Sequence, residues 1–186
     1  FTGFDTLSTN DWWNRIDNKI INLKVPREDV VAFGIYTTAN NKLKITAQLF
    51  PLFPKETREV RLAFFIDNQW KVIQSQKLNE LGWSTTFSVE NWNMKKGVRY
   101  RLLHGESAYF EGFIRKEPSD KEELSIAALS CNSNKDRGNR ENYVRNINAL
   151  DPDLIFFAGD QSYDHKEHTA AWLKFGLQFR ETFRNR

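Results

Sequence analysis

The sequence predicts a mixed fold, in which an N-terminal antiparallel β-sandwich is followed by a βαβ unit that opens an α/β domain. Apolar and polar residues alternate with a period of two through much of residues 29–114, which indicates strands with one buried face. A charged segment follows, and the apolar residues beyond it come in continuous runs. These observations divide the chain into a sandwich domain, residues 1–118, and the start of a second domain, residues 124–186.

The alternation in the first domain is clearest in a few short runs. Their inward-facing members are predicted to be Leu43, Ile45, Ala47 and Leu49, then Val60, Leu62, Phe64 and Ile66, then Trp83, Thr85, Phe87 and Val89, and finally Val98, Tyr100 and Leu102. Turn-forming residues separate the runs, at Asp67-Asn68, at residues 79–82 and at Lys96-Gly97. About seven short strands at this spacing are typical of an immunoglobulin- or fibronectin-like sandwich.

A predicted linker, residues 115–123 (RKEPSDKEE), separates the two domains because it contains a proline and lacks apolar residues. Beyond it, residues 124–129 (LSIAAL) and 153–159 (DLIFFAG) are apolar runs of strand length without alternation. Such strands are typically buried on both faces, as in parallel sheets. The second domain is therefore expected to begin with two buried parallel strands.

The segment between these two strands predicts a crossover helix. Residues 139–150 have helical spacing, with Tyr143, Ile147 and Leu150 on one face, and Asp151-Pro152 ends the pattern. Strand, helix and strand within about forty residues form a βαβ unit, whose crossover is expected to be right-handed. Residues 168–183 predict another helix, with an apolar stripe formed by Trp172, Phe175, Phe179 and Phe183.

Composition limits the classes of function. Hydrophobic residues make up 40% and charged residues 27%, which supports a packed core and argues against disorder. The net charge of +3 is small and no basic block stands out, so nucleic-acid binding has little support. Cys131 is the only cysteine, which excludes an internal disulfide framework. The longest apolar runs are far shorter than a membrane span, so no transmembrane segment is expected.

The two ends of the sequence also carry an expectation. The chain starts at Phe1 rather than Met, shows no recognisable signal peptide, and ends at Arg186 within a helical pattern. We therefore expect it to be part of a longer protein. The sequence does not indicate an oligomeric state.

Residues that can carry chemistry follow both apolar runs. Ser130-Cys131-Asn132 follows the first run, and a Gly159-Asp160 pair with Tyr163 follows the second. In open parallel sheets ligands bind at the carboxyl ends of the strands, and neighbouring strands lie about 4.8 Å apart. If these strands are neighbours, a thiolate, a carboxylate and a phenol converge on one edge and can bind a metal ion. The thiolate favours a transition metal, and the carboxylate can bridge to a harder second ion.

These motifs resemble the opening of the catalytic domain in the alkaline phosphatase D-like (PhoD-like) branch of the calcineurin-type metallophosphoesterases. Proteins of this family often carry an N-terminal β-sandwich before the metallophosphatase domain. That domain opens with a buried strand ending in Ser-Cys, followed by a helix and a second strand ending in Gly-Asp-x-x-Tyr. The matching residues here are Ser130-Cys131 and Gly159-Asp160-Gln161-Ser162-Tyr163.

The resemblance implies a metal-dependent hydrolase of phosphoric esters, either a phosphomonoesterase or a phosphodiesterase. It implies that Cys131, Asp160 and Tyr163 bind Fe(III), and that Asp160, the expected catalytic residue, bridges to Ca(II); other divalent metals are alternatives. Two such ions would activate water and hold the phosphate oxygens. The family also implies a periplasmic or secreted location. Only the first third or less of the catalytic domain is matched, so these 186 residues alone are expected to be inactive.

A second enzyme hypothesis uses different chemistry at the same cysteine. Cys131 and Arg137 match the C-x5-R pattern of cysteine-dependent phosphatases, in which the thiolate attacks phosphorus while loop amides and the arginine hold the oxygens. Two features argue against it. The loop has no internal glycine, and Arg137 is followed by Gly138 rather than by a hydroxyl residue.

The alternatives to catalysis are structural roles or binding. Cys131 alone reads as a small buried residue, Asp160 as a cap and Tyr163 as a packing aromatic. Asp164, His165 and His168 fit a solvated surface, and His104 fits a structural role within a strand. The chain could also be a noncatalytic module whose sandwich contacts carbohydrate or protein. Exposed Trp residues on one face of the sandwich would favour that hypothesis.

Overall fold

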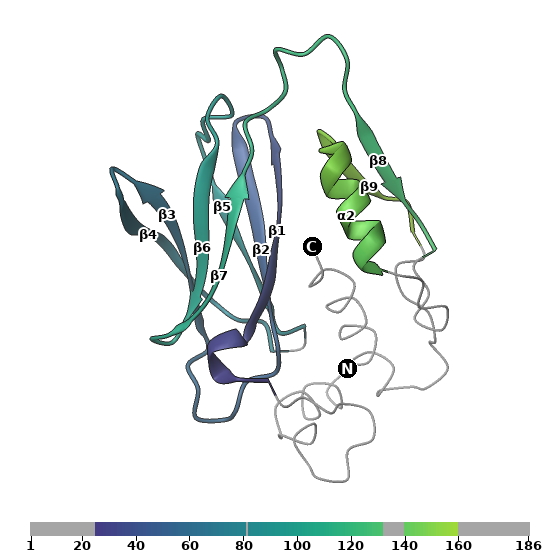
Figure 1. The fold of residues 1–186 in the computed structure, drawn as a ribbon. Coiled ribbons are helices and arrows are strands. Elements are labelled where there is room, and N and C mark those ends of the chain that lie inside the picture. The colour runs from purple at the N-terminus through teal and green to yellow at the C-terminus, as the bar shows by residue number, and fades with distance from the viewer. Residues whose placement is uncertain (1–24, 81, 132–139, 160–186) are drawn as a thin grey trace. The chain divides into compact units, whose positions relative to one another are not determined.

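The computed structural model describes residues 25–80, 82–131 and 140–159. The chain divides into two compact units, Phe1–Glu117 and Pro118–Arg186, and the division falls inside the predicted linker. Strands dominate the described part of the first unit (Figure 1). In the part of the chain that the structure describes, no helix is both long enough and apolar enough to cross a membrane.

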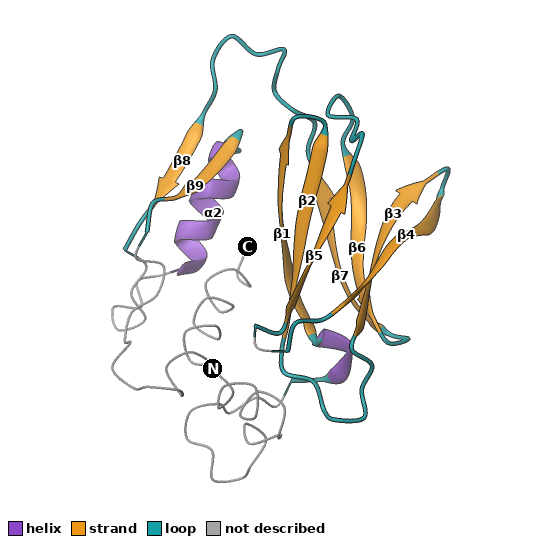
Figure 2. Ribbon diagram, turned by 180° about the vertical axis from the view of Figure 1, so that it is seen from behind, coloured by secondary structure: helices purple, strands orange, loops and turns teal. Residues whose placement is uncertain are grey.

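The first unit contains two antiparallel sheets, which Figure 2 shows from behind. Among the described residues, one sheet has the strand order β1-β2-β5 and the other has the order β4-β3-β6-β7. Their strands are β1 (Val31–Ala39), β2 (Lys42–Leu49), β3 (Glu59–Ile66), β4 (Gln69–Lys77), β5 (Ser84–Val89), β6 (Val98–His104) and β7 (Ala108–Ile114). A short 3-10 helix, η2 (Arg27–Asp29), precedes β1. The antiparallel, β-rich character predicted for this part is confirmed.

The inner faces of the two sheets share one core. All the inward-facing residues of β2 are buried, as their alternation predicts: Leu43, Ile45, Ala47 and Leu49. The sheets approach closely at Gly34 in β1, because a Cβ atom there would lie 2.6 Å from Leu102 Cδ1 and 2.9 Å from Tyr100 Oη, both in β6. A side chain at this position would collide with the facing sheet, so the packing depends on glycine.

Two of the hairpins turn on residues with left-handed backbones. Asn40 and Asn41 join β1 to β2 with φ values of 51° and 58°, and Asp67 and Asn68 join β3 to β4 with φ values of 53° and 61°. Positive φ at both central residues is typical of the type I′ turn, whose twist matches that of the flanking strands. The turn predicted at Asp67-Asn68 is therefore confirmed.

Strand β3 departs from simple alternation. The register between β3 and β4 shifts between Leu62 and Ala63, and Ile73 is the extra residue on β4. The burial of Ile66 was predicted wrongly, since this residue is 37% exposed. It lies at the hairpin end, beyond the last β3 residue that pairs with β6, which is Phe64. The core therefore stops short of the end of the strand.

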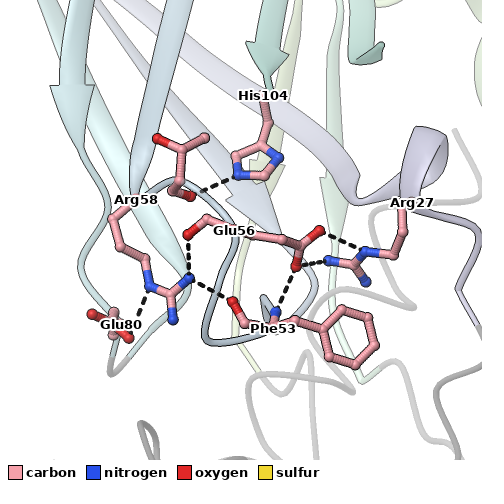
Figure 3. Close-up of polar contacts among 7 residues, drawn as sticks. Arg27, Phe53, Glu56, Arg58, Glu80 and His104 are labelled. Atoms are coloured by element: carbon pink, nitrogen blue, oxygen red, sulfur yellow. Dashed lines mark hydrogen bonds and ion pairs between the residues drawn. The ribbon is translucent and has the colours of Figure 1, made fainter. Parts of the chain in front are cut away.

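Two arginines hold the irregular connection between β2 and β3 (Figure 3). Arg27 donates from Nε and Nη2 to the two carboxylate oxygens of Glu56, at 2.7 Å and 2.5 Å. Glu56 also accepts a hydrogen bond from the backbone N–H of Phe53. Arg58 donates from Nη1 to the carbonyls of Phe53 and Glu56, at 2.9 Å and 2.8 Å, and its Nε pairs with Glu80 at 3.1 Å. These contacts satisfy backbone groups that a loop cannot pair by itself.

His104 belongs to the same end of the sandwich, where Figure 3 shows its ring above the loop. The side chain is buried, and its Nε2 lies 2.8 Å from the carbonyl oxygen of Thr57. A carbonyl only accepts, so Nε2 carries the proton and donates this bond. The structural role predicted for His104 agrees with its burial and its backbone partner.

The second unit contains a parallel strand pair. Strand β8 (Ile126–Leu129) pairs in parallel with β9 (Leu154–Phe157), and α2 (Arg140–Leu150) lies between them in the sequence. This order confirms the predicted strand, helix and strand. That the unit opens a metallophosphatase domain stays a prediction.

Helix α2 ends where the sequence predicts. Asp151 adopts a left-handed backbone, with φ 44°, and its N–H donates to the carbonyl of Ile147 at 3.1 Å, directly before Pro152. The predicted apolar stripe is only partly covered. Ile147 is half-buried, whereas Tyr143 and Leu150 are exposed.

The β8–β9 pair is not buried on both faces within the described chain. Exposure alternates along each strand, and the exposed members are Ile126, Ala128, Leu154 and Phe156. Their neighbours are half-buried, and both views show α2 alongside the pair (Figures 1 and 2). The prediction of burial on both faces is therefore wrong for the described residues, because one face is uncovered there.

Candidate functional site

The carboxyl ends of β8 and β9 lie side by side. The parallel register runs from Ile126 opposite Leu154 to Leu129 opposite Phe157. Backbone hydrogen bonds continue beyond the strands, because Ala158 N–H donates to the carbonyl of Leu129 at 2.8 Å. The predicted parallel arrangement is confirmed, and the two strands are neighbours, which was the condition for the predicted site.

This pairing brings Cys131 next to Gly159, the residue before Asp160. The N–H of Cys131 donates to the carbonyl of Gly159 at 3.4 Å. Cys131 is exposed, and its Sγ lies 3.3 Å from Ser130 Oγ. The thiol therefore stands at the carboxyl edge of the strand pair, where ligands of open parallel sheets bind.

Both strand ends turn through unusual backbone conformations. Cys131 has φ 58° and Gly159 has φ 109°. The left-handed region is uncommon for a residue with a side chain, and the Gly159 conformation is one that L side chains rarely adopt. Apart from chain neighbours, no described atom lies within 4 Å of the position that a Cβ of Gly159 would take. Backbone geometry rather than crowding therefore requires glycine at the end of β9.

The opposite end of the pair is held by Asp153, whose role the sequence reasoning missed. Its Oδ2 accepts hydrogen bonds from the N–H and hydroxyl of Ser125, at 3.0 Å and 3.1 Å, and its Oδ1 pairs with Lys121 at 2.6 Å. The Lys121 ammonium, and then the Ser125 N–H, lower the pKa of Asp153 to about 2. The carboxylate therefore holds the beginning of β9 against the residue before β8. The sequence signal was a polar residue near the start of each apolar run.

The remaining predicted site residues lie outside the described part of the chain. These residues are Asp160 and Tyr163 of the metal-site prediction, Arg137 of the cysteine-phosphatase alternative, and Asp164, His165 and His168 of the surface prediction. Within residues 25–80, 82–131 and 140–159, no three His, Cys, Asp or Glu side chains gather as a metal-binding group. The described structure thus places Cys131 and the residue preceding Asp160 at one edge, and the ligand set stays a prediction.

One of three comparisons with known proteins supports this fold. No family model and no curated protein matches the sequence. A solved structure of PhoD is similar, with a TM-score of 0.66 and 13% sequence identity. The similarity covers 88% of this chain and 37% of that chain, so this chain spans little more than a third of the length of the structure it matches. At this level of identity the similarity concerns the fold, and the chain has a PhoD-like fold over most of its length.

Proposed function

We propose that this chain forms the front part of a metal-dependent phosphoric ester hydrolase of the PhoD-like type. One observation carries the proposal. The parallel β8–β9 pair sets Cys131 beside Gly159, directly before Asp160, within a fold similar to that of PhoD. The two motifs that resemble the family are 28 residues apart in the sequence, counted from Cys131 to Gly159 (159 minus 131), and the fold brings them together.

The residue types of the two motifs suit a mixed pair of metal ions. The exposed thiol of Cys131 is a soft ligand, which favours a transition metal over calcium, and the family resemblance makes that metal iron. The carboxylate of Asp160 suits both iron and calcium. Tyr163 would add a phenolate to the iron site. Asp160 would help to hold both ions and would be the catalytic residue, and Cys131 and Tyr163 would hold iron.

The bound ions would supply Lewis-acid chemistry for in-line displacement at phosphorus. The residues of this chain would keep the metal ligands in position. The pairing of β8 with β9 fixes the backbone beside Cys131, and the Asp153–Ser125 contacts hold the same pair at its other end. The substrate class proposed is a phosphoric mono- or diester.

The test compares two carboxylates in the full-length protein that contains this chain. Hydrolysis of a chromogenic phosphomonoester and a phosphodiester is measured before chelation, after chelation and after metal is added back. Asp160→Asn should lower turnover by at least about 100-fold and reduce bound iron and calcium together, because second-shell changes alone cost up to about 100-fold. Asp164→Asn is the matched control, with turnover and metal content unchanged. Normal metal content and turnover in Asp160→Asn would refute the proposal.

A binding readout separates metal ligation from the cysteine-phosphatase alternative. A phenolate and a thiolate both donate charge to Fe(III), so the iron-loaded protein should show a broad visible band that weakens in Tyr163→Phe. Cys131→Ser should deplete iron more than calcium. The alternative instead requires activity that survives complete metal removal and is lost in Arg137→Ala.

A further inference from the structure

The outer face of the four-stranded sheet carries a cluster of aromatic and charged side chains. We call it the aromatic–arginine face, and it consists of Phe65 of β3, Trp70 of β4, Arg99 and Arg101 of β6, and Tyr109 and Glu111 of β7. It lies opposite the core, since Tyr100 and Leu102, which alternate with the two arginines, are buried inward. Strands β4, β3, β6 and β7 lie side by side in this sheet (Figure 1), so residues far apart in the sequence meet on it.

The two arginines are stacked against aromatic rings. The guanidinium carbon of Arg101 lies 4.2 Å from the ring centroid of Trp70 and 4.4 Å from that of Tyr109, so it is close to both rings. The guanidinium carbon of Arg99 lies 4.9 Å from the Phe65 centroid and 5.4 Å from the Trp70 centroid. Stacking of this kind adds attraction and restricts the rotation of the long side chains.

Glu111 orients both arginines from one side. Its Oε2 accepts a hydrogen bond from Arg101 Nε at 2.9 Å, and its Oε1 accepts bonds from Arg99 Nε, at 3.0 Å, and from Arg99 Nη2. The hydrogen bond from Arg99 lowers the pKa of Glu111 most, partial burial opposes this shift, and Arg101 lowers it further. The carboxylate is therefore ionised at neutral pH and holds the guanidinium groups in fixed orientations.

Each arginine keeps donors that no residue of the described chain uses. Within the described chain, Arg101 makes no hydrogen bond from Nη1 or Nη2, and Arg99 makes none from Nη1. The Arg99 side chain is 50% exposed and that of Arg101 is 27% exposed. A guanidinium that is already held in place and still has unused N–H donors can bind a carboxylate favourably. Binding then costs little further conformational entropy of the arginine side chain.

Exposed apolar side chains flank these donors on the same face. Val72 aligns across the sheet with Ala63 and Arg101, and Phe113 aligns with Arg99. Val72 is 55% exposed and Phe113 is 53% exposed. Surfaces that combine aromatic rings, arginine and exposed apolar groups are typical of protein–protein contact sites.

The charge balance indicates the chemistry of the partner. The aromatic–arginine face holds two arginines and one glutamate, a net charge of +1 (two minus one). Arg61 adds one more positive charge beside it, since the register places Arg61 opposite Leu103, and Leu103 opposite Tyr109. A polyanion such as nucleic acid binds through many phosphate contacts, which this face does not offer. One or two carboxylates would match its charge, and apolar side chains beside them would cover Val72 and Phe113.

We propose that the aromatic–arginine face is a docking surface for an acidic segment of a partner protein. The open donors of Arg101 and Arg99 bind a carboxylate of that segment, and the flanking apolar residues of the segment pack on Val72 and Phe113. This function is separate from phosphoester hydrolysis, because every residue involved lies in the sandwich unit.

The test uses the full chain and a fluorescent twelve-residue peptide that repeats Asp-Phe-Asp-Leu. Binding is followed by fluorescence polarisation, and NMR follows the Nε–H signals of Arg99 and Arg101. The peptide should bind with a dissociation constant below about 1 mM and shift both signals. Its counterpart with Asn in place of every Asp should bind at least about tenfold more weakly, since that loss corresponds to one charged contact.

Variants locate the binding on this face. Arg101→Gln removes the open donors, and Val72→Glu adds a negative charge at an exposed position, where the fold should tolerate it. Each should weaken peptide binding by about tenfold or more. Lys42→Gln, which removes a charge from the other sheet, is the matched control and should change binding by less than about twofold.

The outcomes that overturn the proposal are distinct. Peptide binding that is absent at millimolar concentration, or unaffected by both Arg101→Gln and Val72→Glu, would exclude this face as the docking surface. Equal binding of the Asn peptide would exclude recognition of carboxylates. Heparin that binds more tightly than the acidic peptide, and loses binding in Arg101→Gln, would assign the face to an anionic polysaccharide instead.

Discussion

The sandwich and the β8–β9 pair use apolar residues in different ways. In the sandwich, polar residues alternate with apolar ones, and side chains such as Ile45 and Leu102 are fully buried between the sheets. In the β8–β9 pair the runs are apolar without alternation, and Leu154 and Phe156 stay more than half exposed. Alternation gives each sheet one polar face for solvent and one apolar face. Two such sheets can therefore bury their apolar faces against each other. A continuous apolar run needs cover on two faces, and that cover must come from elements outside the run.

The largest expected effect comes from a test that removes one leucine from each region. Leu102→Ala should lower the free energy of unfolding by about 2–5 kcal/mol, because it leaves a cavity between the two sheets. Leu154→Ala should cost less than about 1 kcal/mol, because the side chain is 53% exposed. Urea unfolding followed by circular dichroism measures both. A loss at Leu154 as large as that at Leu102 would mean that the exposed face is covered in solution.

A second pair of substitutions separates crowding from backbone strain. Gly34→Ala should destabilise the sandwich by about 1–3 kcal/mol, because its new Cβ would lie 2.6 Å from Leu102 Cδ1. Gly159→Ala should cost about 1–3 kcal/mol for a different reason, since φ there is 109° and the space is open.

Double variants distinguish these two causes. Adding Leu102→Ala should offset part of the cost of Gly34→Ala, so that the two free-energy changes are not additive. The same addition should leave the effect of Gly159→Ala unchanged. Additive behaviour at Gly34 would show that the sheets move apart freely and that crowding does not require glycine there.

Acid should destabilise the β8–β9 pair by protonating one carboxylate, that of Asp153. The pKa of Asp153 falls from an ordinary value of 3.8 to about 2, with Lys121 as the largest cause. A lowered pKa means that the carboxylate stabilises the folded pair above pH 4 or so, and that this contribution is lost as the pH falls through about 2. The protection of the Ser125 amide against hydrogen exchange, relative to its intrinsic rate at each pH, should therefore fall across that interval. In Asp153→Asn this pH-dependent fall should disappear, and an unchanged profile would mean that the carboxylate does not hold the pair.

The smallest expected effect comes from an exposed ion pair in the sandwich. Lys71 and Asp67 lie 2.7 Å apart, but the Asp67 side chain is 75% exposed. Lys71→Gln should change the free energy of unfolding by less than about 0.5 kcal/mol, because solvent screens the pair. The urea midpoint measures this. A loss above 1 kcal/mol or so would show that exposed pairs stabilise this sheet far more than is usual.

Much of the fold could be predicted because its signals are local. The period-two pattern of residues 43–49 predicts which residues of β2 face the core, and all of them are buried. The Asp67-Asn68 turn and the helix end at Asp151-Pro152 depend on backbone preferences of the residues themselves. At the candidate site, the sequence predicted that Cys131 and Asp160 lie side by side if the two strands are neighbours. The strands are neighbours, and their pairing brings Cys131 to Gly159, the last described residue before Asp160.

What the sequence determined by itself was therefore the type of each element and the face that it buries, since these follow from spacing and local backbone preference. The tertiary structure decided which elements are neighbours. The aromatic–arginine face exists only because β3 pairs with β6, a strand more than thirty residues later, and no local pattern specifies that pairing. The exposure of Ile66 has the same cause, because it depends on where β6 stops pairing with β3. Asp153 likewise holds Ser125 across 28 residues, a contact that forms only once the two strands have met.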